Sequence, residues 1–270
     1  MTRPNLTLAM ILAAALLQSF KPVAAPTVKA DSGNMGYQDM KSNGAGLSPL
    51  ACNISALNPR QRLRIRALLD EFRSGCKEVR ELSNGYSVRL PAEGSIISDA
   101  AEFISLERLC CPFFDFALQS RREGGPVWLT LTGRAGVKEF ARLEFGMNQV
   151  PRQDLHQETV SDQTSSTATE SPLVCNDRAL NPAQSDRLGA LSKGLRAAKQ
   201  GIREFPDGYA IQLPVSADSI RDIAEFMSIV RLCSPYFETA LLVECDGGPA
   251  WLKITGRQGV KELVRADLHI

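Results

Sequence analysis

The sequence predicts an α+β protein made of two tandem copies of an α-ββ-α-ββ-α sandwich with a mainly antiparallel sheet. Two observations predict this class. The second half of the chain repeats the first without a gap, so that Cys52 aligns with Cys175. Within each half, stretches of helical periodicity alternate with pairs of short strand-like stretches joined by turn residues. The 270 residues, 44 % of them hydrophobic, suffice for two separate cores.

The internal repeat can be followed through its whole length. The stretch "CNISALNP" at 52–59 matches "CNDRALNP" at 175–182, and "GGPVWL" at 124–129 matches "GGPAWL" at 247–252. Somewhat under half of the aligned positions are identical. We therefore assign repeat 1 to residues 50–147 and a degenerate repeat 2 to residues 174–270. We expect the two repeats to pack on each other as an intramolecular pseudo-dimer.

Each element of repeat 1 has its own local signal. Asn58 and Pro59 are the N-cap and first-turn residues of a first helix. Asn84-Gly85 is typical of a β-hairpin turn, as is Asp207-Gly208 in repeat 2. Pro112 ends or follows a middle helix. The expected elements are a hairpin over 79–82 and 86–90, a helix over about 95–111, a second hairpin over 116–120 and 127–132, and a helix over about 135–144.

Three segments lie outside the repeats. Residues 1–30 combine a basic start with the apolar stretch Leu6–Phe20 and end at Val28-Lys29-Ala30, which predicts a cleaved signal peptide and a secreted or periplasmic protein. An uncleaved anchor is one alternative; a segment without targeting function, and then a cytoplasmic protein, is the other. The apolar stretch is shorter than the roughly 20 residues of a membrane span, so no stable span is expected. Residues 31–49 predict a flexible tether, and residues 148–173, rich in Ser, Thr, Gln and Asp, a disordered linker.

Composition excludes several classes of function. The net charge is +1 and no segment is strongly basic, so we expect no nucleic-acid partner. The two histidines, His156 and His269, lie outside the predicted elements, which leaves Cys, Asp, Glu, Ser, Tyr and Lys to carry any chemistry. There is no P-loop, no HExxH and no CxxC motif. These absences favour a binding protein over an enzyme.

A pair of adjacent cysteines marks the candidate site. In "ERLCCPFF", Cys110 and Cys111 follow Glu107 by three and four residues, which places all three near one face of a helix. That face is otherwise apolar, and a buried carboxylate costs several kcal/mol unless it is paired or protonated. Neighbours on a helix diverge by about 100°. Convergence of the two thiols therefore requires the helix to unwind near Pro112.

Repeat 2 provides an internal control for this site. Val230 stands where repeat 1 has Glu107, and Ser234 stands in place of Cys111. Cys233, the counterpart of Cys110, is kept. The joint loss of a carboxylate and a thiol indicates that both belong to one function, which repeat 2 has lost.

Four interpretations of the cysteines remain open. Cys52, which recurs as Cys175, completes a possible metal-ligand set; without histidine such a set suits a soft ion, namely Zn²⁺, Cu⁺ or a heavier metal. Oxidation in an exported protein would instead form one disulfide per repeat, stapling a non-catalytic interaction module. In the third interpretation, one of the vicinal cysteines acts as a redox or nucleophilic thiol. In the fourth, the cysteines are buried and chemically inert. The metal set is Cys52, Glu107, Cys110 and Cys111; the disulfide pairs are Cys52–Cys110 and Cys175–Cys233.

The stretches "LERLCCPFFDFAL" and "GGPVWLTLTGRAGVKEF" resemble a group of small uncharacterised bacterial domains. These domains carry E-R-x-C-C-P-F, then G-P-x-W-L-x-L-T-G and G-x-K-E-F. The resemblance covers Cys52 to about Glu144, and Cys52, Glu107, Cys110 and Cys111 match the hallmark positions. Some relatives occur among heavy-metal resistance functions, so the resemblance implies a role connected with metals.

Other recurring residues are given structural roles. Phe113, Phe114 and Phe116 are expected in the core. Asp99 and its counterpart Asp222 are expected at solvated helix positions.

Overall fold

The structure is a computed structural model that describes residues 47–147 and 171–268. The predicted signal segment, nearly all of the tether and most of the linker lie outside these residues. The described residues belong to one compact unit, which contains both of the predicted repeats.

In the described part of the chain, eight antiparallel strands form a single sheet in the order β1-β2-β4-β3-β7-β8-β6-β5. The centre of the sheet joins the two halves, because β3 pairs with β7 and Leu118 lies opposite Leu241. This confirms the predicted α+β class with an antiparallel sheet. The strands are β1 (Glu78–Leu82), β2 (Gly85–Leu90), β3 (Asp115–Ser120), β4 (Val127–Thr132), β5 (Gly201–Phe205), β6 (Gly208–Leu213), β7 (Phe237–Val243) and β8 (Ala250–Gly256).

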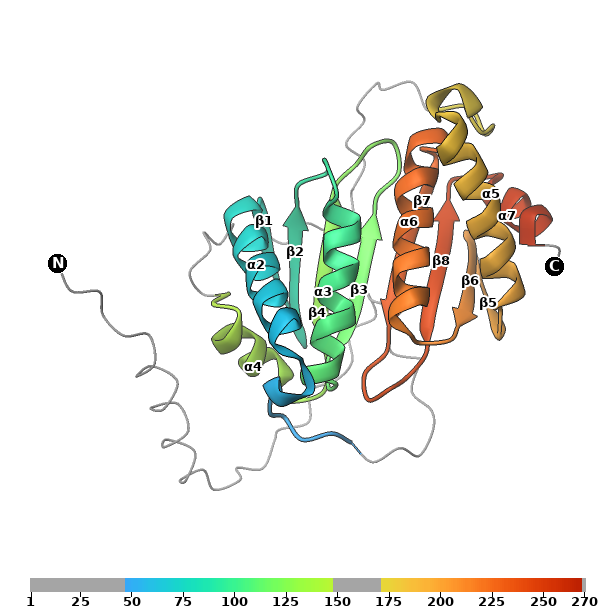
Figure 1. Ribbon diagram of the computed structural model, residues 1–270. Helices are drawn as coiled ribbons and strands as arrows, with labels where there is room; N and C mark the ends of the chain where they lie inside the picture. The colour runs from blue at the N-terminus through green and yellow to red at the C-terminus, as the bar shows by residue number, and fades with distance from the viewer. Residues whose placement is uncertain (1–46, 148–170, 269–270) are drawn as a thin grey trace, which may run out of the picture. The chain divides into compact units, whose positions relative to one another are not determined.

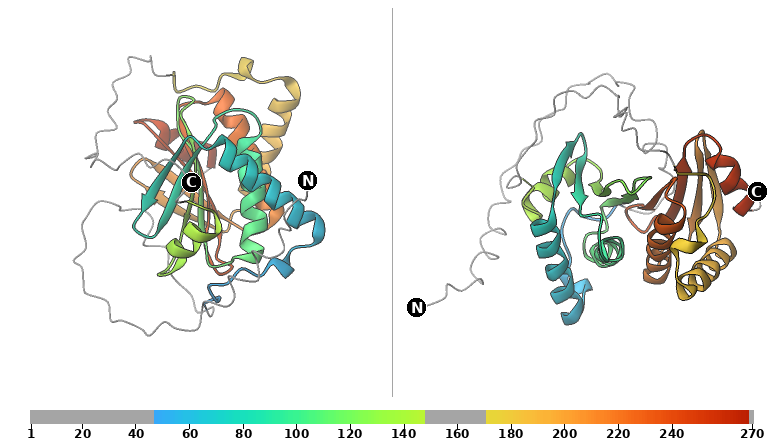
Figure 2. Two further views of the ribbon diagram at one scale, coloured as in Figure 1. Left: turned by 90° about the vertical axis from the view of Figure 1, so that its left-hand side faces the viewer. Right: turned by 90° about the horizontal axis from the view of Figure 1, so that it is seen from above.

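Four long helices lie side by side along the sheet (Figure 1). Viewed from above, α2, α3, α6 and α5 all lie on the same side of the strands (Figure 2). Helices α3 and α6 contact each other, so the central helices join the halves as the central strands do. The described α-helices are α2 (Pro59–Gly75), α3 (Ile96–Cys110), α4 (Val137–Glu144), α5 (Pro182–Ala197), α6 (Ala217–Cys233) and α7 (Val260–Leu268); short 3₁₀ helices precede α2 (Ile54–Ala56) and α5 (Asp177–Ala179).

The start of α2 forms where the sequence predicts it. The side chain of Asn58 accepts a hydrogen bond from the Gln61 amide at 3.0 Å, and the Gln61 side chain accepts one from the Asn58 amide at 2.9 Å. Asn181 and Gln184 form the same pair at the start of α5. These reciprocal bonds satisfy backbone donors that would otherwise lack a partner. They fix where the chain enters each helix.

The core beside α3 is aromatic. Phe113, Phe114 and Phe116 are each at most 1 % exposed, which confirms their predicted place in the core. The rings of Phe113 and Phe140 pack edge to face with centroids 4.9 Å apart. Phe103 packs against Phe145 in the same way at 6.1 Å. These rings fill the space between the helices and the sheet next to the vicinal cysteines.

The expectation of solvated aspartates is wrong for Asp99. This residue is 9 % exposed, and Nη2 of Arg64 on α2 donates to its carboxylate at 2.6 Å. Ser95 also donates to the same carboxylate. Asp222 is more exposed and pairs with Arg187 at 3.1 Å. The partner of Asp99 lies on another helix, so the helix pattern alone did not indicate it.

Candidate metal centre

Two separate segments of the first half meet at the end of α3. Cys110 is the last residue of this helix and Cys111 its C-cap, with a φ of −127°. The Asn53 amide donates a hydrogen bond to the Cys110 carbonyl at 2.7 Å. This bond holds the segment that carries Cys52 against the helix end. The helix therefore ends between the two thiols, which allows both to face Cys52.

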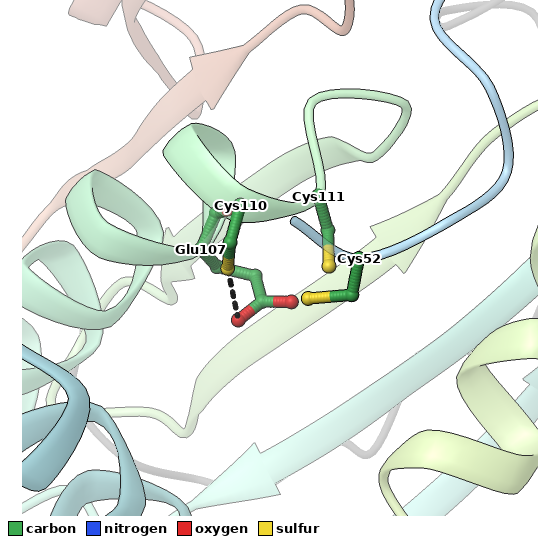
Figure 3. A group of neighbouring side chains, drawn as sticks. All are labelled: Cys52, Glu107, Cys110 and Cys111. Carbon is green, nitrogen blue, oxygen red and sulfur yellow. Dashed lines mark hydrogen bonds between the residues drawn. The ribbon is translucent and has the colours of Figure 1, made fainter. Parts of the chain in front are cut away.

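The structure brings together the four residues that the sequence analysis selected as ligands. One ligand atom from each of Cys52, Glu107, Cys110 and Cys111 lies within 4.8 Å of all the others. Figure 3 shows the Cys52 sulfur and the Glu107 carboxylate pointing toward each other, with the Cys111 sulfur beside them. Glu107, Cys110 and Cys111 are at most 4 % exposed, whereas Cys52 is exposed. The cluster is thus a buried set of donors with its open side at Cys52.

Cys110 is held as a neutral hydrogen-bond donor. Its sulfur lies 3.4 Å from the Glu107 carbonyl oxygen and 3.8 Å from that of Leu106. It also lies 3.7 Å from Oε2 of Glu107. A thiol surrounded by oxygen acceptors keeps its proton unless a metal ion replaces it.

The three thiols have very different acidities. Hydrogen bonds from Cys110 and Cys111 lower the pKa of Cys52 to about 4, against the opposing effect of partial burial. The pKa of Cys111 is raised by its hydrogen bonds to Cys110 and Cys52 and by burial. A hydrogen bond from Cys111 lowers the pKa of Cys110, but Cys52, burial and Glu107 outweigh it, and that pKa is raised as well. Without metal, Cys52 is therefore the most acidic of the three thiols, and Cys110 and Cys111 keep their protons.

Glu107 titrates near neutrality. Burial raises its pKa from an ordinary value of 4.5 to about 7. Negative charge on Cys52 and Glu144 adds to this effect, while hydrogen bonds from Cys111 and Cys110 oppose it. A carboxyl group with this pKa accepts or releases a proton at physiological pH. It is thus suited to take up a thiol proton or to bind a cation.

Residues 47–147 and 171–268, which include every cysteine of the chain, contain no disulfide bond. All seven cysteines are free, so neither Cys52–Cys110 nor Cys175–Cys233 is bonded. Cys76 lies outside the cluster and donates to the Glu78 carbonyl at 3.5 Å.

The second half keeps the scaffold of the site without its chemistry. The Asn176 amide donates to the Cys233 carbonyl at 2.7 Å, as Asn53 does to Cys110. Val230 and Ser234 are both 4 % exposed and occupy the positions of Glu107 and Cys111. The pKa of Cys175 is raised to about 12, mainly by burial, in contrast to that of Cys52.

The second half also supports the site from outside, which sequence reasoning missed. The Asp246 amide donates to the carbonyl of Pro112, directly after the vicinal cysteines, at 2.6 Å. Asp246 adopts a φ of 54°, and its carboxylate accepts from the Ser48 amide at 3.1 Å and from Arg134 at 3.3 Å. The corresponding loop of the first half contacts the second half in the same way: the Glu123 amide donates a hydrogen bond to the Pro235 carbonyl at 2.6 Å. In the sequence these loops carry only hairpin-turn signals.

Comparisons of the chain with protein-family models, curated proteins and solved structures find no match. Over residues 47–147 and 171–268, none of the helices has the length and apolar content of a membrane span. The second half of the same chain, which lacks the carboxylate and one of the thiols, is therefore the comparison for the cluster.

Proposed function

We propose that the first half of the chain binds one soft, thiophilic metal ion through Cys52, Cys110 and Cys111, with Glu107 as fourth ligand or proton acceptor. The observation that carries this proposal is the convergence of four ligand atoms within 4.8 Å of one another. In a tetrahedral zinc site with bonds of about 2.3 Å, the ligand atoms lie about 3.8 Å apart. Side-chain adjustments of at most about 1 Å therefore close the cluster around an ion.

The proton inventory favours an ordered binding reaction. The Cys52 thiolate is exposed and needs no proton loss, so it makes the first contact with the ion. Cys110 and Cys111 must then lose their protons, since thiolates are the metal ligands. Glu107 lies beside both thiols and accepts one of these protons on the way to solvent.

The role of Glu107 depends on the ion. Zn²⁺ takes four ligands in a tetrahedron, and the Glu107 carboxylate is the protein group in the cluster that can serve as the fourth. Cu⁺ prefers soft thiolates, so three sulfur ligands suffice and Glu107 stays protonated beside them. Replacing Glu107 by Gln keeps its size while removing its charge. This variant therefore weakens Zn²⁺ binding and spares Cu⁺ binding.

The test uses the reduced, full-length protein under anaerobic conditions, with Zn²⁺ or Cu⁺ delivered against a competing chromophoric chelator. We expect one ion per chain by native mass spectrometry. Cys110→Ser and Cys52→Ser abolish this binding, whereas the matched changes Cys233→Ser and Cys175→Ser in the second half do not. Unchanged stoichiometry in Cys110→Ser refutes the proposal, as does protein from its own compartment that lacks metal and carries the disulfides.

A second candidate function is thiol redox chemistry, favoured by the exposed, acidic thiol of Cys52 next to two further thiols. A peroxide would oxidise the Cys52 thiolate to a sulfenic acid and release hydroxide. The thiol of Cys111 or Cys110 would then displace water and form a disulfide. Rapid, stoichiometric peroxide consumption by the metal-free protein, lost in Cys52→Ser, favours this function; consumption no faster than that of free cysteine excludes it.

We further propose that residues 50–147 and 174–270 are duplicated copies of one domain that form a pseudo-dimer. The identical order of elements and the symmetric strand order support this. We also propose kinship with the small bacterial E-R-x-C-C-P-F domains, and export directed by residues 1–30. Detection of a mature N-terminus near residue 31 in extracellular or periplasmic fractions tests the export proposal.

A further inference from the structure

The second half contains a cavity of about 350 Å³ at the place that the metal-binding cluster occupies in the first half. Its walls come from α5, α6, α7 and the sheet, and they include Cys175, Cys233 and Ser234, the counterparts of Cys52, Cys110 and Cys111. The exposed residues Val174 and Asp267 also line it, so the cavity opens to the surface there. Its volume falls within the range of about 300–1,000 Å³ typical of small-molecule sites.

The cavity exists because the second half has smaller side chains at matched positions. Leu195 replaces Phe72 on the first long helix, and Leu268 replaces Phe145 on the last. In the first half these two phenylalanine rings pack against Phe103, and the cavity beside them measures about 50 Å³. The side chain is also smaller at a third lining position, where Ser192 replaces Leu69.

The lining of the cavity indicates the chemistry of its occupant. Leu195, Leu252 and Val264 are buried apolar walls. One end is polar, because Ser234 and Tyr236 line it, and the Ser234 hydroxyl lies 3.7 Å from the Cys233 sulfur. At the mouth, Arg196 donates to the Asp267 carbonyl at 3.2 Å. The Arg196 and Asp267 side chains, which both line the cavity, carry opposite charges, and the absence of a net charge between them favours a neutral ligand.

We propose that this cavity binds a small neutral aromatic molecule that carries one hydroxyl group. The ring system lies among the leucine, isoleucine and valine side chains, and the hydroxyl group hydrogen-bonds to Ser234 at the polar end. An engineered apolar cavity of about 150 Å³ is large enough for benzene, so a cavity of this size has room for two fused rings. The proposal concerns the second half and does not depend on metal binding in the first.

The test uses 2-naphthol as the probe, titrated into the reduced, metal-free full-length protein and followed by probe fluorescence and calorimetry. We expect saturable binding of one molecule per chain. Leu195→Phe and Leu268→Phe install the residues of the first half; each lowers the affinity at least tenfold without lowering the melting temperature. Ser234→Ala lowers the affinity several-fold and leaves the stoichiometry at one. Cys110→Ser, which removes the proposed metal site, leaves probe affinity unchanged.

Two results overturn the proposal. The first is the absence of saturable binding while Leu195→Phe raises the melting temperature, which identifies an empty packing void. The second is binding that neither filling variant affects, which places the probe elsewhere. If a phenylalanine variant does not fold, Ser192→Leu narrows the same cavity at its half-buried wall and must weaken binding in the same direction.

Discussion

Replacing Glu107 by Val tests the buried carboxyl group directly, since Val230 occupies the same position in α6. In the metal-free protein, burial raises the pKa of Glu107 from about 4.5 to about 7. A raised pKa in the folded state stabilises the protein below pH 4.5, and this contribution is lost as the pH rises through 7. At about 1.4 kcal/mol per pKa unit, the full effect is about 3 kcal/mol.

The expected result is a pH-dependent gain in stability. Between pH 5 and pH 8, the free energy of unfolding of the Glu107→Val variant rises by roughly 2–3 kcal/mol relative to that of the unmodified protein. Urea denaturation at the two pH values, with reductant and a metal chelator present, measures this difference. The zinc affinity of the Glu107→Val variant falls while its stability rises, because the variant lacks the fourth ligand.

The matched control introduces the same group into the second half. Val230→Glu places a carboxyl group at a position that is 4 % exposed, so it destabilises the protein more at pH 8 than at pH 5. A stability difference between Glu107→Val and the unmodified protein that stays constant from pH 5 to pH 8 would falsify the assignment of a near-neutral pKa to Glu107.

Three further predictions follow from the site and its supports. The pKa of Cys52 is lowered to about 4 and that of Cys175 is raised to about 12. Iodoacetamide should therefore modify Cys52 in the metal-free protein nearly as fast at pH 6 as at pH 8, and should leave Cys175 untouched. Peptide mass spectrometry measures both rates, and a tenfold slower reaction of Cys52 at pH 6 contradicts the prediction. Asp99→Ala breaks an ion pair with Arg64 in which the aspartate is largely buried, and it should lower the free energy of unfolding by about 1–3 kcal/mol. The matched change Asp222→Ala breaks a more exposed pair with Arg187 and should cost less. Equal losses in urea titrations would show that burial of the aspartate does not strengthen the pair. Asp246→Ala removes the carboxylate that accepts from Arg134 and Ser48 and puts an alanine at a φ of 54°, so the loop that donates to the Pro112 carbonyl loses its side-chain contacts. Metal affinity should fall several-fold at unchanged stoichiometry, which chelator competition measures. Unaltered affinity would show that the Asp246 carboxylate does not support the site.

Much of the fold could be predicted because its signals are local. The capping pair at Asn58 and the turn at Asn84-Gly85 each act over a few residues, and the helices and hairpins formed close to their predicted bounds. The middle helix, expected over about 95–111, ends one residue earlier, at Cys110. That single residue matters for the site, since it frees Cys111 from helical geometry and turns its thiol toward Cys52.

By itself, the sequence determined the α+β class, and it predicted the internal repeat and the four residues of the candidate site. The substitutions at Val230 and Ser234 singled out Glu107 and Cys111 among them within one chain. Only the tertiary structure decided that Cys52 reaches the end of α3, that β3 pairs with β7, and that Asp246 contacts the backbone after the vicinal cysteines. It alone also showed the cavity in the second half, which arises from several small side chains on different helices. The physical reason is that these features depend on contacts between residues far apart in the chain, whereas periodicity, caps and turns report only on neighbours.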